Sequence, residues 1–104
     1  MSETKVFMLS LYKLKIFSTV IREGSFSQAA KSLYLTQSAI SQHINALEAQ
    51  LGSSLFERTQ RGVQLTSAGE TLHLYAKQIL WLSEAAESAT SDISTLKDIV
   101  LNLG

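Results

Sequence analysis

The sequence predicts a mainly α-helical fold with a helix-turn-helix unit, a short hairpin and a long final helix. Three observations lead to this prediction. Apolar residues recur at helical spacing between residues 36 and 51, and a break of two residues separates them from a shorter helical stretch. An apolar heptad row then follows residue 66. With 104 residues, the chain has the length of one domain, or of one domain with an extension.

The first predicted helix begins after Ser10, which is a candidate N-cap, and ends at Gly24. A glycine suits the left-handed position that often follows a helix. The residues before Ser10 show no clear period and are expected to fray. The inner face is expected to be core and consists of Leu14, Phe17, Val20 and Ile21.

A second, shorter helix is predicted next. Ser25 has capping-box spacing, but Ser27 is a rival N-cap, so two starts remain open. The pair Ala29–Ala30 allows a close crossing with a neighbouring helix. Tyr34–Leu35 is long enough only for a tight turn, and Thr36 is a good N-cap for the following helix. Two helices joined in this way form a helix-turn-helix unit.

The helix that starts after Thr36 has two contrasting faces. Its apolar stripe consists of Ile40, Ile44, Leu47 and Leu51. Its opposite face consists of Ser38, Ser41, Gln42, Asn45 and Ala49. Short, uncharged side chains suit close contact with a polar partner, and Gln and Asn amides can pair with base edges in a DNA major groove. On this helix alone, a solvated surface helix poor in charge is an equal alternative.

Residues 55–58 and 63–65 read as two short strands joined by a four-residue connection that contains Gly62. A hairpin after a helix-turn-helix unit is a wing. Arg61 is expected at its tip, where a guanidinium can enter a narrow minor groove; the alternative is a solvated loop arginine. Arg58 lies at the strand end, and binding a phosphate or bracing the hairpin against an acid both remain open.

Thr66 is predicted to cap a long helix that reaches about residue 94. A heptad row runs along it, formed by Leu72, Tyr75, Ile79, Leu82, Ala86, Ala89, Ile93 and Leu96. A narrow row of this length predicts pairing with a second copy of the chain. Trp81 lies off the row and is expected on the domain body or on the partner. The end of the chain from residue 99 reads as a strand, with continued helix as the alternative.

Composition excludes several classes of protein. The chain has no cysteine, and His43 and His73 are far apart in sequence, so neither a metal nor a cofactor is expected. Neither a glycine-rich phosphate loop nor a Ser-His-carboxylate grouping is present, so the chain is not predicted to be an enzyme. The apolar patch at residues 6–9 is interrupted by Lys13 and Lys15, which indicates neither a signal peptide nor a membrane partner.

The formal net charge is zero, but it is distributed unevenly. Residues 1–66 carry seven basic and four acidic side chains, whereas residues 67–104 carry two basic and five acidic ones. The basic half contains the helix-turn-helix unit and is therefore expected to face phosphate. Because the excess of positive charge is modest, we expect weak and salt-sensitive non-specific affinity for DNA.

Several motifs at fixed spacing carry a family resemblance: Gly24-Ser25-Phe26, Ala29-Ala30, Gln37-Ser38-Ala39-Ile40-Ser41, Leu47-Glu48, Leu51-Gly52 and Leu55-Phe56-Glu57-Arg58. From about residue 11 to residue 82, the chain resembles the N-terminal DNA-binding domain of LysR-type transcriptional regulators. Ser38 departs from the family pattern, which commonly has proline there. The resemblance implies base or groove contacts by Gln37, Ser38, Ser41, Gln42 and Arg61, and a phosphate contact by Thr36.

The resemblance also implies an organisation. It divides the chain into a winged helix-turn-helix domain at 1–65, a linker or dimerisation helix at 66–96, and the start of a missing effector-binding domain at 97–104. The expected DNA-binding residues are Thr36, Gln37, Ser38, Ser41, Gln42, Asn45, Arg58 and Arg61. The expected dimerisation residues are Leu72, Tyr75, Ile79, Leu82, Ala86 and Ile93.

Together these features predict a sequence-specific transcriptional regulator of the bacterial cytoplasm. It is expected to bind an inverted repeat in double-stranded DNA as a homodimer, or as a tetramer when full-length, with a small-molecule effector bound only by the absent domain. Two alternatives remain open. One is a stand-alone regulator without a ligand domain, and the other is a coiled-coil adaptor that uses the same fold for protein contacts.

Overall fold

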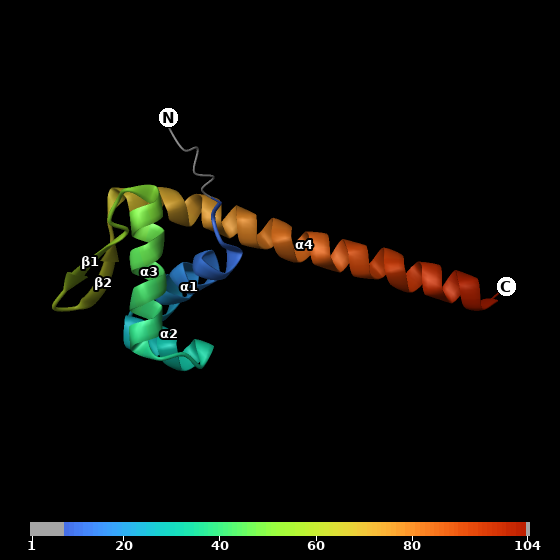
Figure 1. Ribbon diagram of the computed structural model, residues 1–104, viewed down its shortest axis with the longest axis horizontal. Coiled ribbons are helices and arrows are strands. Elements are labelled where there is room, and N and C mark those ends of the chain that lie inside the picture. The colour runs from blue at the N-terminus through green and yellow to red at the C-terminus, as the bar shows by residue number, and fades with distance from the viewer. Residues whose placement is uncertain (1–7, 104) are drawn as a thin grey trace, which may run out of the picture.

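The computed structural model describes the backbone of residues 8–103 and the side chains of residues 8–93. In this part of the chain, helices α1, α2 and α3 form a body beside a two-stranded antiparallel hairpin, and a long helix projects from it (Figure 1). The elements are α1 (Leu11–Glu23), α2 (Phe26–Leu33), α3 (Gln37–Leu51), β1 (Phe56–Thr59), β2 (Gly62–Leu65) and α4 (Ser67–Leu103). The predicted winged helix-turn-helix with a long following helix is confirmed.

The helix ends follow from local side-chain chemistry. Ser10, Ser25 and Thr36 each accept a hydrogen bond from the backbone N–H three residues later, as N-caps do. Ser25 is therefore the cap of α2, and the rival start at Ser27 is wrong. Gly24 ends α1 in the left-handed conformation, as predicted, and Gly52 ends α3 in the same way.

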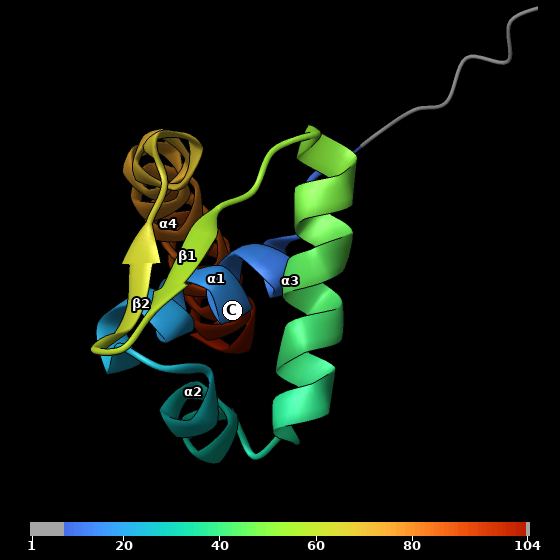
Figure 2. The same cartoon turned by 90° about the vertical axis from the view of Figure 1, so that its left-hand side faces the viewer.

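The core lies around α1, which contacts α2, α3 and α4. Figure 2 shows α1 between α4 with the hairpin on one side and α3 on the other. The predicted stripe of α3 is buried at Ile40, Ile44 and Leu47, but Leu51 is 40% exposed because it is the last residue of the helix. The pair Ala29–Ala30 is buried, which is consistent with the predicted close crossing of α2 and α3.

The hairpin differs from its prediction by one residue. Arg58 pairs with Val63 and Thr59 pairs with Gly62, so the strands extend further and the connection is only two residues long. Gly62 has a positive φ of 118°, and an added Cβ atom would lie 3.0 Å from the carbonyl oxygen of Gly24. The wing therefore packs closely on the loop that follows α1, and glycine is required at this contact.

Helix α4 begins with a tight junction to the body. The hydroxyl of Thr66 accepts a hydrogen bond from the Gly69 N–H at 3.0 Å and donates one to the Ser54 carbonyl at 2.6 Å. At Gly69, a Cβ atom would overlap the carbonyl oxygen of Leu55. The helix then continues through Leu103, so the strand predicted from residue 99 is wrong and the helical alternative holds.

The heptad row of α4 is divided between two environments. Leu72 is only 8% exposed and belongs to the core, and Ile79 packs against that core, so these two residues are buried by their own chain. The row was predicted to pair with a second copy along its whole length, and this is wrong for Leu72 and Ile79, because α4 packs against α1. Tyr75 and Leu82 are about 60% exposed. The side chain of Leu96 lies outside the described residues.

Trp81 is 66% exposed, so of its two predicted placements the one on the domain body is wrong, and the one on a partner stays a prediction. It lies two residues beyond Ile79, on the side of α4 that points away from the body. Within the described part of the chain, no helix combines the length and apolarity needed to cross a bilayer.

Candidate nucleic-acid interface

The outer face of α3 is a polar surface held on a rigid helix. Gln37, Ser38, Gln42 and Asn45 are exposed, and Ser41 is half-buried. The opposite side of the same helix is anchored by Ile40, Ile44 and Leu47, which are at most 1% exposed. This burial fixes the rotation of the helix, so the polar side chains present one defined pattern of donors and acceptors.

The N-terminus of α3 is open on the same surface. Thr36 closes the first turn, since its side chain accepts from the Ala39 N–H at 3.0 Å and its carbonyl accepts from the Ile40 N–H. The N–H groups of Gln37 and Ser38 lie before the first residue whose N–H bonds to a carbonyl within the helix. They therefore have no acceptor in the helix itself. The Thr36 hydroxyl keeps its own proton for donation, which fits the phosphate contact expected of this residue.

The wing places Arg61 in its two-residue turn, where the side chain is exposed. The Thr59 hydroxyl organises this turn: it accepts from the Arg61 N–H and lies 3.3 Å from the Gly62 carbonyl, to which it donates. Arg61 therefore projects from a hydrogen-bonded turn at the end of the hairpin.

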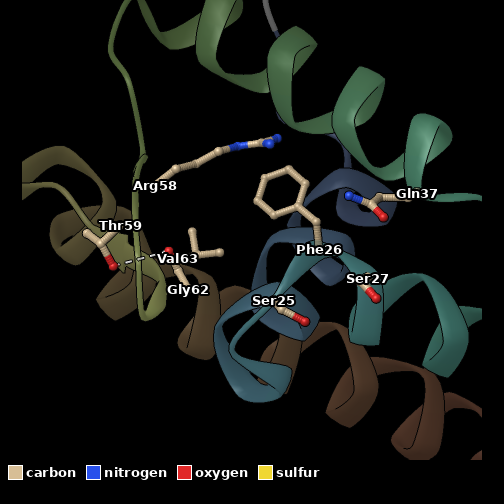
Figure 3. Close-up of a pocket in the computed structure, with 8 residues that line it drawn as sticks. All are labelled: Ser25, Phe26, Ser27, Gln37, Arg58, Thr59, Gly62 and Val63. Carbon is tan, nitrogen blue, oxygen red and sulfur yellow. Dashed lines mark hydrogen bonds between the residues drawn. The ribbon is translucent and has the colours of Figure 1, made fainter.

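A shallow cleft of about 180 Å³ joins the wing to the start of α3 (Figure 3). It is lined by Ser25, Phe26, Ser27, Gln37, Arg58, Thr59, Gly62 and Val63. Apart from Ser25, the N-cap of α2, these residues come from α2, α3 and both strands, so four elements meet here. Of the predicted DNA-binding residues, the cleft brings together Gln37 and Arg58, whereas Gln42 and Asn45 lie further along α3.

The surroundings of Arg58 bear on its two open roles, which are binding a phosphate and bracing the hairpin against an acid. Among the described residues, the ion pair found joins Arg22 to Glu23 at 3.3 Å and does not involve Arg58. Its guanidinium instead lies 4.8 Å from the centre of the Phe26 ring. Within the described residues, no acid therefore braces the hairpin through Arg58, and its N–H groups take part in no hydrogen bond there.

Sequence reasoning missed Phe26 as a residue of this surface. It is 7% exposed and appears as core, yet it lines the cleft and supports Arg58. One sequence signal pointed to an aromatic contact for Arg58. Side chains alternate along a strand, so Phe56 and Arg58, two residues apart, share the face of β1 that packs on the body.

The two histidines have other surroundings. The ring of His43 packs edge-on against Tyr12, with 5.1 Å between ring centres. The Nδ1 atom of His73 is buried without a hydrogen-bond partner. Among the described residues, no three His, Asp or Glu side chains gather into a group that could hold a metal ion.

Comparisons with known proteins agree with this geometry. A model of the family described as bacterial regulatory helix-turn-helix protein, lysR family, matches residues 11–70. The chain is 42% identical over 95 residues to a probable RuBisCO transcriptional regulator of Cyanidioschyzon merolae, covering 91% of this chain and 31% of that protein. It is 48% identical over 77 residues to the HTH-type transcriptional regulator YofA of Bacillus subtilis, covering 74% of this chain and 27% of that protein.

Two solved structures of DNA complexes are also similar. The DNA-binding domain of CbnR, solved with DNA, matches with a TM-score of 0.77 and 35% identity over 83% of this chain and 99% of that one. The DNA-binding domain of BenM, solved with catB site 1 DNA, matches with a TM-score of 0.79 and 35% identity over 83% and 97% of the two chains. The chain spans less than a third of the length of the two curated relatives.

Proposed function

Because the chain belongs to the lysR family of bacterial regulatory helix-turn-helix proteins, we propose that it binds double-stranded DNA sequence-specifically and regulates transcription. The proposal involves no catalytic step, and it places the protein in the bacterial cytoplasm with the DNA it reads. The similar regulators are about three times as long as this chain. We therefore also propose that residues 1–65 bind DNA, residues 66–96 link and dimerise, and an effector-binding domain begins near residue 97.

The observation that carries the proposal is the uncharged polar face of α3. Gln42 and Asn45 are exposed on a helix whose other side is fully buried, so their amides are held outward. An α-helix fits the major groove, and Gln and Asn can each make two hydrogen bonds to an adenine edge. The wing lies beside the start of this helix, where Arg61 would enter the adjacent minor groove.

This face also implies a sequence preference. Its predicted contact residues include neither lysine nor arginine, which make the commonest contacts to guanine. Ala39 and Ala49 supply methyl groups for contact with thymine. The half-sites are therefore expected to be rich in A·T pairs.

A homodimer is part of the proposal. Tyr75, Leu82 and Ile93 are 60%, 59% and 56% exposed on α4, and this apolar surface would be covered by the same surface of a second copy. Two recognition helices related by a two-fold axis would enter successive major grooves. The site would then be an inverted repeat whose half-sites lie about 34 Å apart.

Selection of binding sites from random duplexes, followed by salt titration, tests the function. The affinity for the selected site should fall steeply with salt concentration. Gln42→Ala should lower the binding free energy by about 1–3 kcal/mol and relax the base preference at one position only. Gln78→Ala is the matched control, because it removes an exposed glutamine of α4 away from the polar face. Guanine-dominated half-sites would contradict the proposed readout, and binding without sequence or salt dependence would favour the adaptor alternative.

A further inference from the structure

Arg58 lies on an unusual side of the wing. Side chains alternate along β1, so Arg58 shares the inward face with Phe56, whose ring packs on Phe26 with 5.7 Å between ring centres. Its partner across the strands is Val63, which also lines the cleft. Arg58 itself is exposed, and within the described residues the contact found for its guanidinium is with an aromatic ring, not with a carboxylate.

The ring of Phe26 belongs to the packed core. Phe17 is completely buried and lies 5.3 Å from Phe56, which in turn contacts Phe26. Three rings thus run in contact from the centre of α1 to the cleft, and the guanidinium of Arg58 covers the last one. Because Phe26 is only 7% exposed, its ring has little freedom to move away from Arg58.

The contact leaves the N–H donors of Arg58 free. A guanidinium has five such donors, and within the described residues none of those of Arg58 is engaged in a hydrogen bond or an ion pair. Figure 3 shows the side chain reaching across Phe26 toward the side of the cleft where Gln37 lies. An anion in the cleft would therefore meet a guanidinium that is already oriented.

We propose that Phe26 is a positioning residue for Arg58 and holds its guanidinium to donate to a phosphate of the bound DNA strand in the cleft between the wing and α3. This inference rests on the proposed function, because the phosphate belongs to the duplex. Phe26 acts through Arg58 and itself touches no nucleotide. Its contribution to affinity is the orientation of a long side chain before binding, which reduces the conformational entropy lost in the complex.

A double-mutant cycle on duplex binding tests the role. Phe26→Leu keeps an apolar side chain and removes the ring face, so affinity should fall roughly two- to fivefold. Arg58→Gln should weaken binding about tenfold and lower the salt slope by roughly 0.9. In the Arg58→Gln background, Phe26→Leu should have no further effect. Arg58→Lys should lower the affinity when Phe26 is present. In the Phe26→Leu background, the affinities with arginine and with lysine at position 58 should be equal.

Phe17→Leu is the matched control, because it removes a ring from the same stack without touching Arg58. Its effect on affinity should be the same with and without Arg58. In the free protein, NMR should show the Arg58 side-chain protons shifted by the Phe26 ring current, and Phe26→Leu should abolish that shift. If Phe26→Leu does not fold, Phe26→Met replaces it in both measurements.

The possible failures are distinguishable. If the wild-type chain binds no duplex, the proposed function is overturned and the phosphate contact with it. If the wild type binds but Phe26→Leu lowers affinity equally in both Arg58 backgrounds, only the positioning role is overturned. Absence of the ring-current shift in the free wild-type protein would overturn the positioning role as well.

Discussion

The first turns of α4 and its later turns carry the same apolar repeat but have different surroundings. In the first part, Leu72 and Ile79 face the body and pack on its core. In the later part, Leu82 and Ile93 are more than half exposed, although they belong to the same heptad row. One continuous pattern thus contributes Leu72 and Ile79 to the domain core, while Tyr75, Leu82 and Ile93 form an open surface.

The body covers only the first turns of α4, which extends well past it (Figure 1). Tyr75 is 60% exposed even in these turns, because it lies on the other edge of the row from Leu72 and Ile79. Leu82 and Ile93 lie beyond the covered turns and are exposed. A heptad repeat in a sequence consequently predicts a helix and a buried row, but it does not say which molecule buries each position.

The largest expected effect is on association through the open part of the row. Leu82→Asp should raise the dimer dissociation constant by at least 100-fold, because pairing would bury a carboxylate from each subunit in an apolar contact. The unfolding of the body should be unchanged, since Leu82 is 59% exposed in the single chain. Sedimentation and urea denaturation measure the two quantities separately.

Ser88→Asp is the control for this change. It adds the same charge to an exposed position of α4 on the side opposite the row, so the dimer should persist. An unchanged dimer for Leu82→Asp would reject the heptad row as the association surface.

The next effect concerns the covered part of the row. Leu72→Ala should lower the free energy of unfolding of the body by about 3 kcal/mol, because it opens a cavity in the core. Leu74→Ala, two residues away and 62% exposed, should change it by less than about 0.5 kcal/mol. Denaturation at a fixed low protein concentration provides the comparison, and equal losses would mean that α4 is not docked as described.

A smaller loss is expected where α4 begins against the body. Gly69→Ala should destabilise the fold by about 2 kcal/mol, since the new methyl group meets the backbone of Leu55 and must push the helix away. Ser67→Ala, at the exposed first residue of α4, serves as the control. A gain in stability for Gly69→Ala, as helix propensity alone would give, would contradict the close contact.

The smallest effect should come from Trp81. Trp81→Ala should leave the unfolding of the body unchanged within about 0.5 kcal/mol, because the indole ring is 66% exposed and points away from the core. Thermal unfolding of the monomeric Leu82→Asp variant, with and without Trp81→Ala, measures this. A clear loss of stability would place the ring on the body after all.

Much of the fold was predictable because it depends on local chemistry. The caps at Ser10 and Thr36 and the glycine at the end of α1 act within a single turn, so the sequence contains all the atoms involved. The hairpin was misplaced by one residue, because its register depends on the packing of Gly62 against Gly24, a contact between distant segments.

In the candidate site, too, the locally determined features were predictable and the contacts between distant segments were not. The polar face of α3 could be predicted, since helical spacing alone separates it from the buried stripe. The support of Arg58 by Phe26 could not, because it joins residues 32 positions apart through the fold. The buried position of Leu72 was missed for a related reason, as its partners lie on α1. The roles of the DNA-binding residues at the nucleic acid stay predictions.

The free part of α4 has the properties of a lever. With 37 residues, the helix is about 55 Å long, and somewhat more than half of it extends past the body (Figure 1). A tilt of about 10° where α4 leaves the body, beyond Ile79 and Leu80, would move the far end by about 5 Å over that free length. An attached module would thus sense small rotations of the winged unit, and the stiffness of the packing at Gly69, Leu72 and Ile79 would set how faithfully they are transmitted.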